Sequence, residues 1–145
     1  MTDLTKPRGR IVALDPGERR VGVAVSNSDR TMAFPRTAIA NDDNLLKAIH
    51  ALVVEEDAAA IVIGLPRLLN GKEGASAKQA RLLAGQIEEQ LQGLGVSVDL
   101  HDERLTTVTA QTALREAGLP AREQRQYIDS AAATVLLESW CSCQM

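Results

Sequence analysis

Short apolar runs and tight turns dominate the N-terminal part of the chain. Residues 10–14 contain the apolar run IVAL, which stops at the sequence DPG over 15–17, and 21–25 alternate valine with small residues. Both runs predict strands, and the proline and glycine predict a turn between them. A third strand is expected over 31–39. Together these segments predict an antiparallel meander.

The middle of the chain changes to a helical period. Apolar residues recur at helical spacing from about Asn44, where Asp42 or Asp43 can act as the N-cap. A fully apolar run follows over 59–63 and ends at a glycine and a proline. Such a run is typical of a buried central strand, usually a parallel one. The sequence therefore predicts a helix followed by a strand.

Helix and strand signals continue to alternate towards the C-terminus. A helix capped by Ser76 leads to a strand over 96–100, where apolar and polar residues alternate up to the acidic pair 102–103. A third helix is expected over about 106–118. A basic loop then precedes a last helix, which has an apolar stripe over 128–136.

The resulting order, β-β-β-α-β-α-β-α-α, predicts an α/β fold in which helices flank a five-stranded mixed sheet. With 145 residues and no repeat, we expect one domain over 1–145 with flexible tails at 1–9 and 141–145, the second carrying both cysteines as free thiols. No apolar run is long enough to span a bilayer, and the N-terminal segment lacks the apolar core of a signal peptide. A cytoplasmic protein without membrane contact is expected.

Charge and composition narrow the choice of partner only slightly. The formal net charge of −3 does not favour a nucleic-acid partner, although an acidic protein can still carry a locally basic surface. Aromatic residues make up 2% of the chain, too few for a platform on which bases stack. Any nucleic acid is therefore expected to be recognised by backbone and shape rather than by base identity.

Three acidic residues stand out by their place in the predicted elements. Asp15 ends the first strand, Glu103 ends the fifth, and Asp129 lies in the first turn of the last helix. Carboxylates at strand ends converge on one edge of a sheet, where a pair of divalent cations can hydrolyse a phosphodiester. The same residues also suit a turn, a solvated surface and a helix dipole. The pattern alone leaves both interpretations open.

Four stretches of the chain resemble the motifs of the YqgF/RuvX family. They are DPGERRVGVAVSN, GLPRLLNGKEG, DERLTT and DSAAATVLLE, and their order and spacing also fit. The resemblance implies an RNase H-like fold related to the RuvC resolvases. It places the acidic positions of the family on Asp15, Glu103 and Asp129, as catalytic residues and ligands of Mg²⁺ or Mn²⁺. One departure is Asn27, which stands where relatives often have an aspartate.

The resemblance implies a metal-dependent endonuclease that takes part in 5′-end processing of pre-16S ribosomal RNA. Resolution of Holliday junctions, which are four-way DNA junctions, is the alternative, and a non-catalytic nucleic-acid-binding module is a lesser one. A resolvase needs two sites related by symmetry, so both a monomer and a homodimer remain open. An actin-like ATPase is disfavoured because it needs two domains around its nucleotide.

Several residues near the three acids are candidate contacts to nucleic acid. Glycine lets a phosphate approach the backbone, basic side chains bind phosphate, and threonines at a helix start offer hydroxyl and N–H groups. An ordinary charged surface explains the basic candidates equally well, and a helix cap is sufficient to explain the threonines. The candidates are Gly17, Arg19, Arg20, Arg67, Lys72, Arg104, Thr106 and Thr107. His50 and His101 are expected to be structural, because two-metal hydrolysis needs no histidine.

Overall fold

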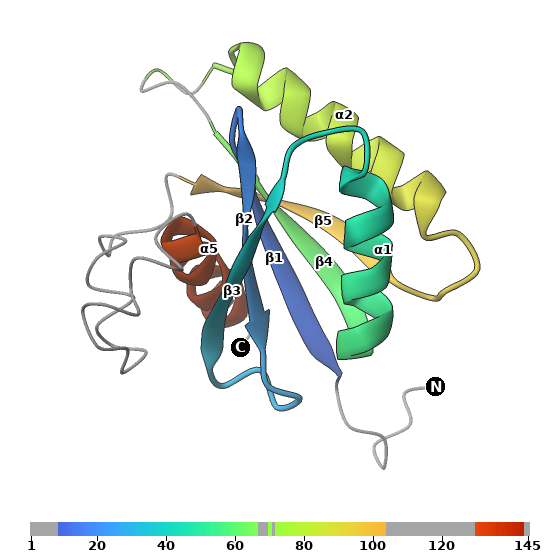
Figure 1. The fold of residues 1–145 in the computed structure, drawn as a ribbon. Coiled ribbons are helices and arrows are strands. Elements are labelled where there is room, and N and C mark those ends of the chain that lie inside the picture. The colour runs from blue at the N-terminus through green and yellow to red at the C-terminus, as the bar shows by residue number, and fades with distance from the viewer. Residues whose placement is uncertain (1–8, 67–69, 71, 104–129, 144–145) are drawn as a thin grey trace.

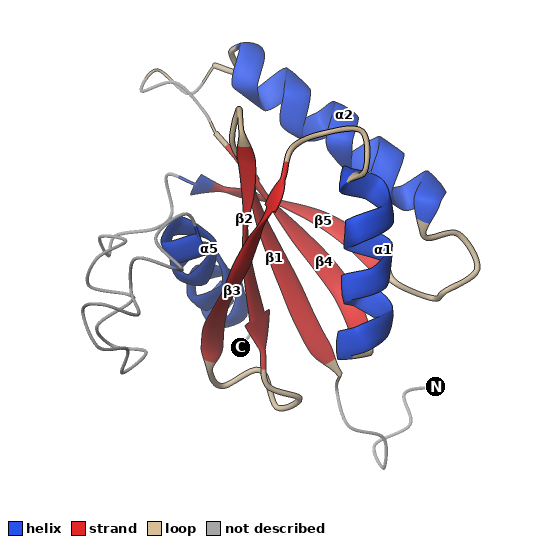
Figure 2. Cartoon of the chain, viewed as in Figure 1, coloured by secondary structure: helices blue, strands red, loops and turns tan. Residues whose placement is uncertain are grey.

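A five-stranded mixed sheet forms the centre of the computed structural model, which describes residues 9–66, 70, 72–103 and 130–143. The strands are β1 (Arg10–Pro16), β2 (Arg20–Ser26), β3 (Ala33–Ala40), β4 (Ala58–Leu65) and β5 (Ser97–Asp102). Their order is β3-β2-β1-β4-β5; β1 to β3 form an antiparallel meander, and β1, β4 and β5 run parallel (Figures 1 and 2). The mixed sheet expected from the sequence is confirmed.

Helices cover both faces of this sheet (Figure 1). Within the described residues they are α1 (Leu45–Glu56), α2 (Ala75–Gln90) and α5 (Ala131–Cys143). Helices α1 and α2 share one face, and α5 covers the other. Alternate strand residues point to opposite faces, so β1 sends Val12 and Leu14 towards α1 and α2 but Ile11 and Ala13 towards α5. Asp15 continues the series on the α5 side.

The other two parallel strands follow the same alternation. In β4, Ala60 and Val62 belong to the core beneath α5, and Gly64 is the next residue of their series. In β5, Asp99 and His101 form hydrogen bonds with side chains of α5. At the C-terminal ends of the three parallel strands, Asp15, Gly64 and His101 therefore all lie on the α5 side of the sheet.

The start of α2 differs from the expectation. Ser76 was the predicted cap, but it lies inside the helix, and Gly74 is the N-cap residue. The reason is that the Gly74 carbonyl already accepts the first helical hydrogen bond, from the Lys78 N–H at 3.2 Å. At α1 the helix starts near Asn44 as expected, but the N-cap residue is Asn44 itself and not Asp42 or Asp43. There the Asp42 carboxylate accepts the Asn44 N–H at 2.9 Å.

The C-terminal helix extends into the stretch that was expected to be a tail. Helix α5 continues to Cys143, because Cys141 is half-buried and packs against the core beneath α5. This burial raises the pKa of the Cys141 thiol. The helix expected over 106–118 lies outside the described residues. Among the helices that the structure does describe, none is long and apolar enough to cross a membrane.

Candidate functional site

The C-terminal ends of β1, β4 and β5 bring Asp15 and Glu103 together. Asp15 is the penultimate residue of β1, and Glu103 directly follows the last residue of β5. Their side chains form a hydrogen bond with each other, although β4 runs between the two strands. Two of the three acids predicted from the sequence therefore lie in contact at the C-terminal ends of the parallel strands.

Gly64 of β4 makes room for this contact. It pairs with His101 of β5, and the residue before it, Ile63, pairs with Leu14 of β1. A Cβ atom added at Gly64 would collide with the carboxylate of Glu103, whose Cδ would be 3.1 Å away. Any larger residue would therefore displace the Glu103 side chain. In the sequence, Gly64 only marks the end of an apolar run. The one sequence feature that could have suggested its role is that the strands before and after it in the predicted parallel sheet both end in acids.

Burial and two neighbouring acids favour the protonated form of Glu103. Desolvation is the largest cause, followed by the hydrogen bond and the charge of Asp15 and by the charge of Asp102; together they raise the pKa of Glu103 to about 8. At neutral pH the Glu103 carboxyl group therefore keeps its proton beside Asp15. Such a set of crowded oxygen donors fits a hard divalent cation, which would replace this proton.

The third predicted acid, Asp129, lies outside the described residues, as do Arg67, Arg104, Thr106 and Thr107. Within the described ranges, no three or more His, Cys, Asp or Glu side chains group closely enough to hold a metal ion. Ser130, the first described residue after Asp129, is fully buried, and its hydroxyl accepts the Val23 N–H of β2 at 2.9 Å.

The turn between β1 and β2 explains why residue 17 is glycine. The Gly17 N–H donates to the Arg20 carbonyl at 3.0 Å, and the Gly17 carbonyl accepts the Asn41 side-chain amide at 2.8 Å. A Cβ at this position would lie 2.7 Å from the Arg20 carbonyl oxygen. The hairpin therefore requires glycine here, whether or not a phosphate approaches it.

Three basic candidates are exposed within the described part of the chain. Arg19 and Arg20 belong to the β1–β2 hairpin that follows Asp15, and Lys72 lies in the connection from β4 to α2. The Lys72 N–H donates to the Asn70 side chain at 2.9 Å. Both segments start at the C-terminal ends of parallel strands, which is also the end of the sheet where Asp15 and Glu103 lie.

Asn27, the departure from the family resemblance named above, lies at the other end of the sheet. Its side-chain oxygen accepts the N–H groups of Thr31 at 2.9 Å and Met32 at 3.1 Å, which closes the turn between β2 and β3. Because β1 and β2 are antiparallel, with Val12 opposite Val25, this turn lies beside the start of β1. Asn27 therefore serves the hairpin and is remote from the Asp15–Glu103 pair.

Two side-chain hydrogen bonds join β5 to α5. His101 Nε2 lies 3.0 Å from Ser139 Oγ, and Trp140 Nε1 donates to the Asp99 carboxylate at 2.9 Å. Burial lowers the pKa of His101, an effect that the charges of Asp99 and Asp102 oppose. His101 therefore packs as a neutral, hydrogen-bonded side chain, in keeping with the structural role expected for it.

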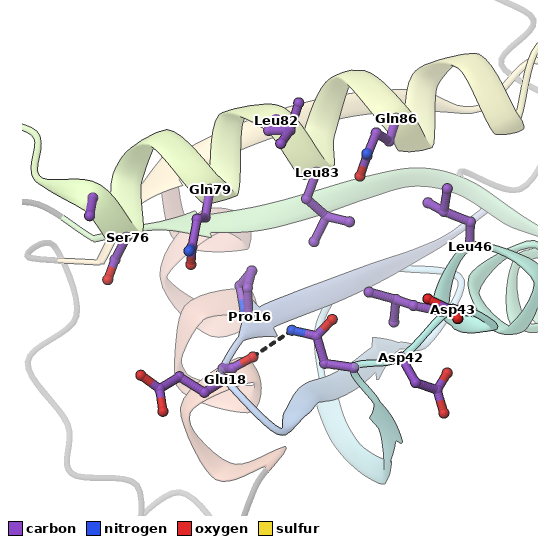
Figure 3. Close-up of a pocket in the computed structure, with 14 residues that line it drawn as sticks. Pro16, Glu18, Asp42, Asp43, Leu46, Ser76, Gln79, Leu82, Leu83 and Gln86 are labelled. Atoms are coloured by element: carbon purple, nitrogen blue, oxygen red, sulfur yellow. Dashed lines mark hydrogen bonds between the residues drawn. The ribbon is translucent and has the colours of Figure 1, made fainter.

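A groove of about 740 Å³ lies on the opposite face, between α1, α2 and the β1–β2 turn (Figure 3). Among the described residues, its lining includes three acids, Glu18, Asp42 and Asp43, and no lysine or arginine, and neither Asp15 nor Glu103 belongs to it. Its negative charge opposes the binding of a phosphate backbone. The C-terminal ends of β1, β4 and β5, on the α5 side of the sheet, are therefore the better candidate for a site that acts on nucleic acid.

Comparison with known proteins agrees with this fold and with the four motifs. The model of the RuvX family, described as Holliday junction resolvases, matches residues 9–142. A protein of Mycolicibacterium paratuberculosis, named as a candidate pre-16S rRNA nuclease, is 44% identical over 135 residues, which cover 92% of this chain and 80% of that protein. A Mycobacterium tuberculosis protein of the same name is 42% identical over 135 residues, covering 92% of this chain and 78% of that protein.

Solved structures share the fold at low sequence identity. Thermus thermophilus RuvC in complex with a Holliday junction superposes with a TM-score of 0.57 at 14% identity, covering 93% of this chain and 96% of that one. The fowlpox virus resolvase in complex with Holliday junction DNA gives 0.60 at 10% identity, covering 94% and 99%. These likenesses confirm the RNase H-like fold related to RuvC. Because the family model spans nearly the whole chain and relatives exceed 40% identity, the chain belongs to the RuvX (YqgF) family of nucleases.

Proposed function

We propose that this chain is a divalent-metal-dependent endonuclease whose site lies at the C-terminal ends of β1, β4 and β5. The observation that supports this most directly is the contact between the Asp15 and Glu103 carboxyl groups across Gly64. Because the half-buried Glu103 carboxyl group keeps its proton at neutral pH, it is poorly suited to a structural ion pair. The pair of Asp15 and Glu103, with oxygen donors only, suits Mg²⁺ or Mn²⁺.

Asp15 and Glu103 would hold the metal, and Asp129 is the proposed third ligand. The support for Asp129 is its neighbour Ser130, which is anchored on β2 next to the strand that carries Asp15. When bound, divalent cations would supply an activated water and would stabilise charge on the leaving oxygen, giving a 5′-phosphate and a 3′-hydroxyl. The task of the protein is to hold the carboxylates in place. Glu103 must release its proton before it can act as a ligand.

The 5′ end of pre-16S ribosomal RNA is the substrate that we propose first. Its support is the name carried by relatives at 42–44% identity. The described basic residues Arg19, Arg20 and Lys72 would contact phosphates beside the cleaved bond, with the Gly17 backbone close by. The same role is proposed for the candidates outside the described residues, Arg67, Arg104, Thr106 and Thr107. A binding module without catalysis is disfavoured, because binding alone would not need the crowded carboxyl pair.

Holliday junctions are the second candidate substrate. The description of the family supports this alternative, as does the likeness to two resolvases solved with junction DNA. Resolution requires two symmetric cuts and therefore a homodimer on the junction. A monomer bound to its substrate would favour RNA processing.

Asp15→Asn tests the site, because the amide keeps the shape of the side chain and removes its charge. We expect it to abolish Mg²⁺- or Mn²⁺-dependent cleavage of a pre-16S RNA fragment while the thermal unfolding transition remains cooperative. Asp43→Asn, an exposed acid on the α1 and α2 face, is the matched control and should cleave normally. Normal cleavage by Asp15→Asn would contradict the site. A synthetic four-way junction, assayed in parallel with sedimentation of the complex, distinguishes the two substrates.

A further inference from the structure

We propose that Ser130 is a positioning residue for the metal site, because its hydroxyl fixes the start of α5 beside the end of β1 that carries Asp15. This inference rests on the proposed function and goes beyond it by naming the contact through which the fold holds its last helix at the site. It depends on one hydroxyl group, two backbone groups and the register of the strands.

The Ser130 hydroxyl lies between a donor and an acceptor of two neighbouring strands. The Val23 N–H donates to Ser130 Oγ at 2.9 Å, and Ser130 Oγ donates to the Arg36 carbonyl at 2.5 Å. Val23 and Arg36 are register partners in β2 and β3. Ser130 is 0% exposed, so water does not compete for these hydrogen bonds. A single buried hydroxyl therefore links β2, β3 and α5.

The ladder between β2 and β3 is irregular at this point, which explains why a side chain can enter it. From one register pair to the next, β2 advances from Val21 to Val23, whereas β3 advances from Ile39 to Arg36 and so uses one residue more. A bulge of this kind disrupts the local hydrogen bonds of the ladder. Buried N–H and carbonyl groups need partners, and the Ser130 hydroxyl serves one of each. This double requirement fixes its position along both strands.

The anchor lies next to the candidate site. Val23 pairs with Leu14 of β1, and the preceding residue, Gly22, pairs with Asp15. The Thr134 hydroxyl donates to the Ser130 carbonyl at 3.0 Å, which ties the anchored residue to the first turn of α5. Ser130 thus sets where α5 begins relative to Asp15. It also follows Asp129, the proposed third ligand, in the chain.

A merely structural hydroxyl would lower stability when removed and would leave metal binding unchanged. Ser26 provides a matched control for that case. It is 2% exposed, and its hydroxyl accepts the Ile11 N–H and donates to the Asn27 carbonyl, both at 2.9 Å. It lies at the opposite end of β2, beside the start of β1. Ser26→Ala therefore removes the same kind of contact far from Asp15.

The test compares wild type, Ser130→Ala and Ser26→Ala by Mn²⁺ binding calorimetry, by the Mg²⁺ dependence of RNA cleavage and by thermal unfolding. We expect both variants to unfold at lower temperature than wild type. Only Ser130→Ala should bind Mn²⁺ about 10–100-fold more weakly and need correspondingly more Mg²⁺ for half-maximal cleavage. Wild-type metal binding in Ser130→Ala, or an equal loss in both variants, would overturn the proposal.

Calorimetry keeps this inference separate from the proposed function. If wild type binds Mn²⁺ at Asp15 but cleaves neither RNA nor junctions, the proposed function fails, and the Mn²⁺ affinity of Ser130→Ala still decides the role of Ser130. If wild type binds no Mn²⁺, both fail. Should Ser130→Ala not fold, Ser130→Cys, which keeps a weaker hydrogen-bonding atom at the same place, replaces it with the same expected and contrary results.

Discussion

The Glu103 carboxylate occupies the space that a side chain at Gly64 would fill, with Glu103 Cδ 3.1 Å from the position of an added Cβ. Because β4 lies between β1 and β5, the Asp15 and Glu103 side chains meet only across this middle strand. A residue without any functional group therefore controls whether the two acids are in contact.

Gly64→Ala should fold but displace the Glu103 side chain. A misplacement of about 1 Å at a catalytic group can lower the rate about 100-fold, and we expect a loss of this size in single-turnover cleavage. Gly85→Ala is the control, because a Cβ at Gly85 of α2 meets nothing within 4 Å. It should raise the free energy of unfolding by about 0.5–1 kcal/mol and leave cleavage unchanged. A fully active Gly64→Ala enzyme would refute the positional role of the glycine.

The stability of the metal-free protein should depend on pH through Glu103. Its pKa is about 8 in the folded state against an ordinary value of 4.5, so the folded protein holds a proton that the unfolded chain releases between these values. The free energy of unfolding should therefore decrease as the pH rises from 4.5 to about 8. Glu103→Gln should remove this component.

Urea denaturation of both proteins with a chelator, over this pH range, measures the effect of Glu103. The difference between wild type and Glu103→Gln isolates it from the other titrating groups. Parallel curves for the two proteins would contradict the raised pKa. Asp15→Asn should shift the decrease to lower pH, because it removes a charge that raises the pKa of Glu103.

Lys72→Gln should weaken substrate binding in a manner that depends on salt. If Lys72 contacts one phosphate, its loss should reduce the slope of log binding constant against log salt concentration by about 0.7–0.9. Lys47→Gln, an exposed lysine of α1 on the opposite face of the sheet, should leave the slope unchanged. Titrations of labelled RNA at several salt concentrations measure both. An unchanged slope for Lys72→Gln would place the substrate path elsewhere.

Trp140→Phe should loosen α5 without affecting the chemistry. The variant loses the hydrogen bond from the indole N–H to Asp99 but keeps an aromatic ring in the core beneath α5. We expect a decrease of about 1 kcal/mol in the free energy of unfolding, measured by circular dichroism in urea. Cleavage at saturating Mg²⁺ should match that of wild type. A large loss of cleavage would show that this end of α5 also affects the site.

The sequence by itself determined the order of the described elements and the position of two acids. Apolar residues at periods of two and 3.6 mark strands and helices wherever one face is buried, and that condition holds for most elements here. Asp15 and Glu103 were recognisable because the C-terminal ends of parallel strands share one edge of a sheet. The local sequence predicted the wrong N-cap at Ser76, because Gly74 already caps α2. It also predicted a flexible tail from Cys141, which tertiary packing keeps helical.

Only the tertiary structure decided how the acids are held together. The role of Gly64 depends on β4 lying between β1 and β5, and no local sequence pattern predicts the order of strands in a sheet. The role of Ser130 depends on a hydrogen bond to Val23, 107 positions away in the chain, at a bulge that periodicity does not reveal. Periodicity reports which face of an element is buried. Contacts between distant residues depend on how the elements are packed, and in this protein those contacts support the site.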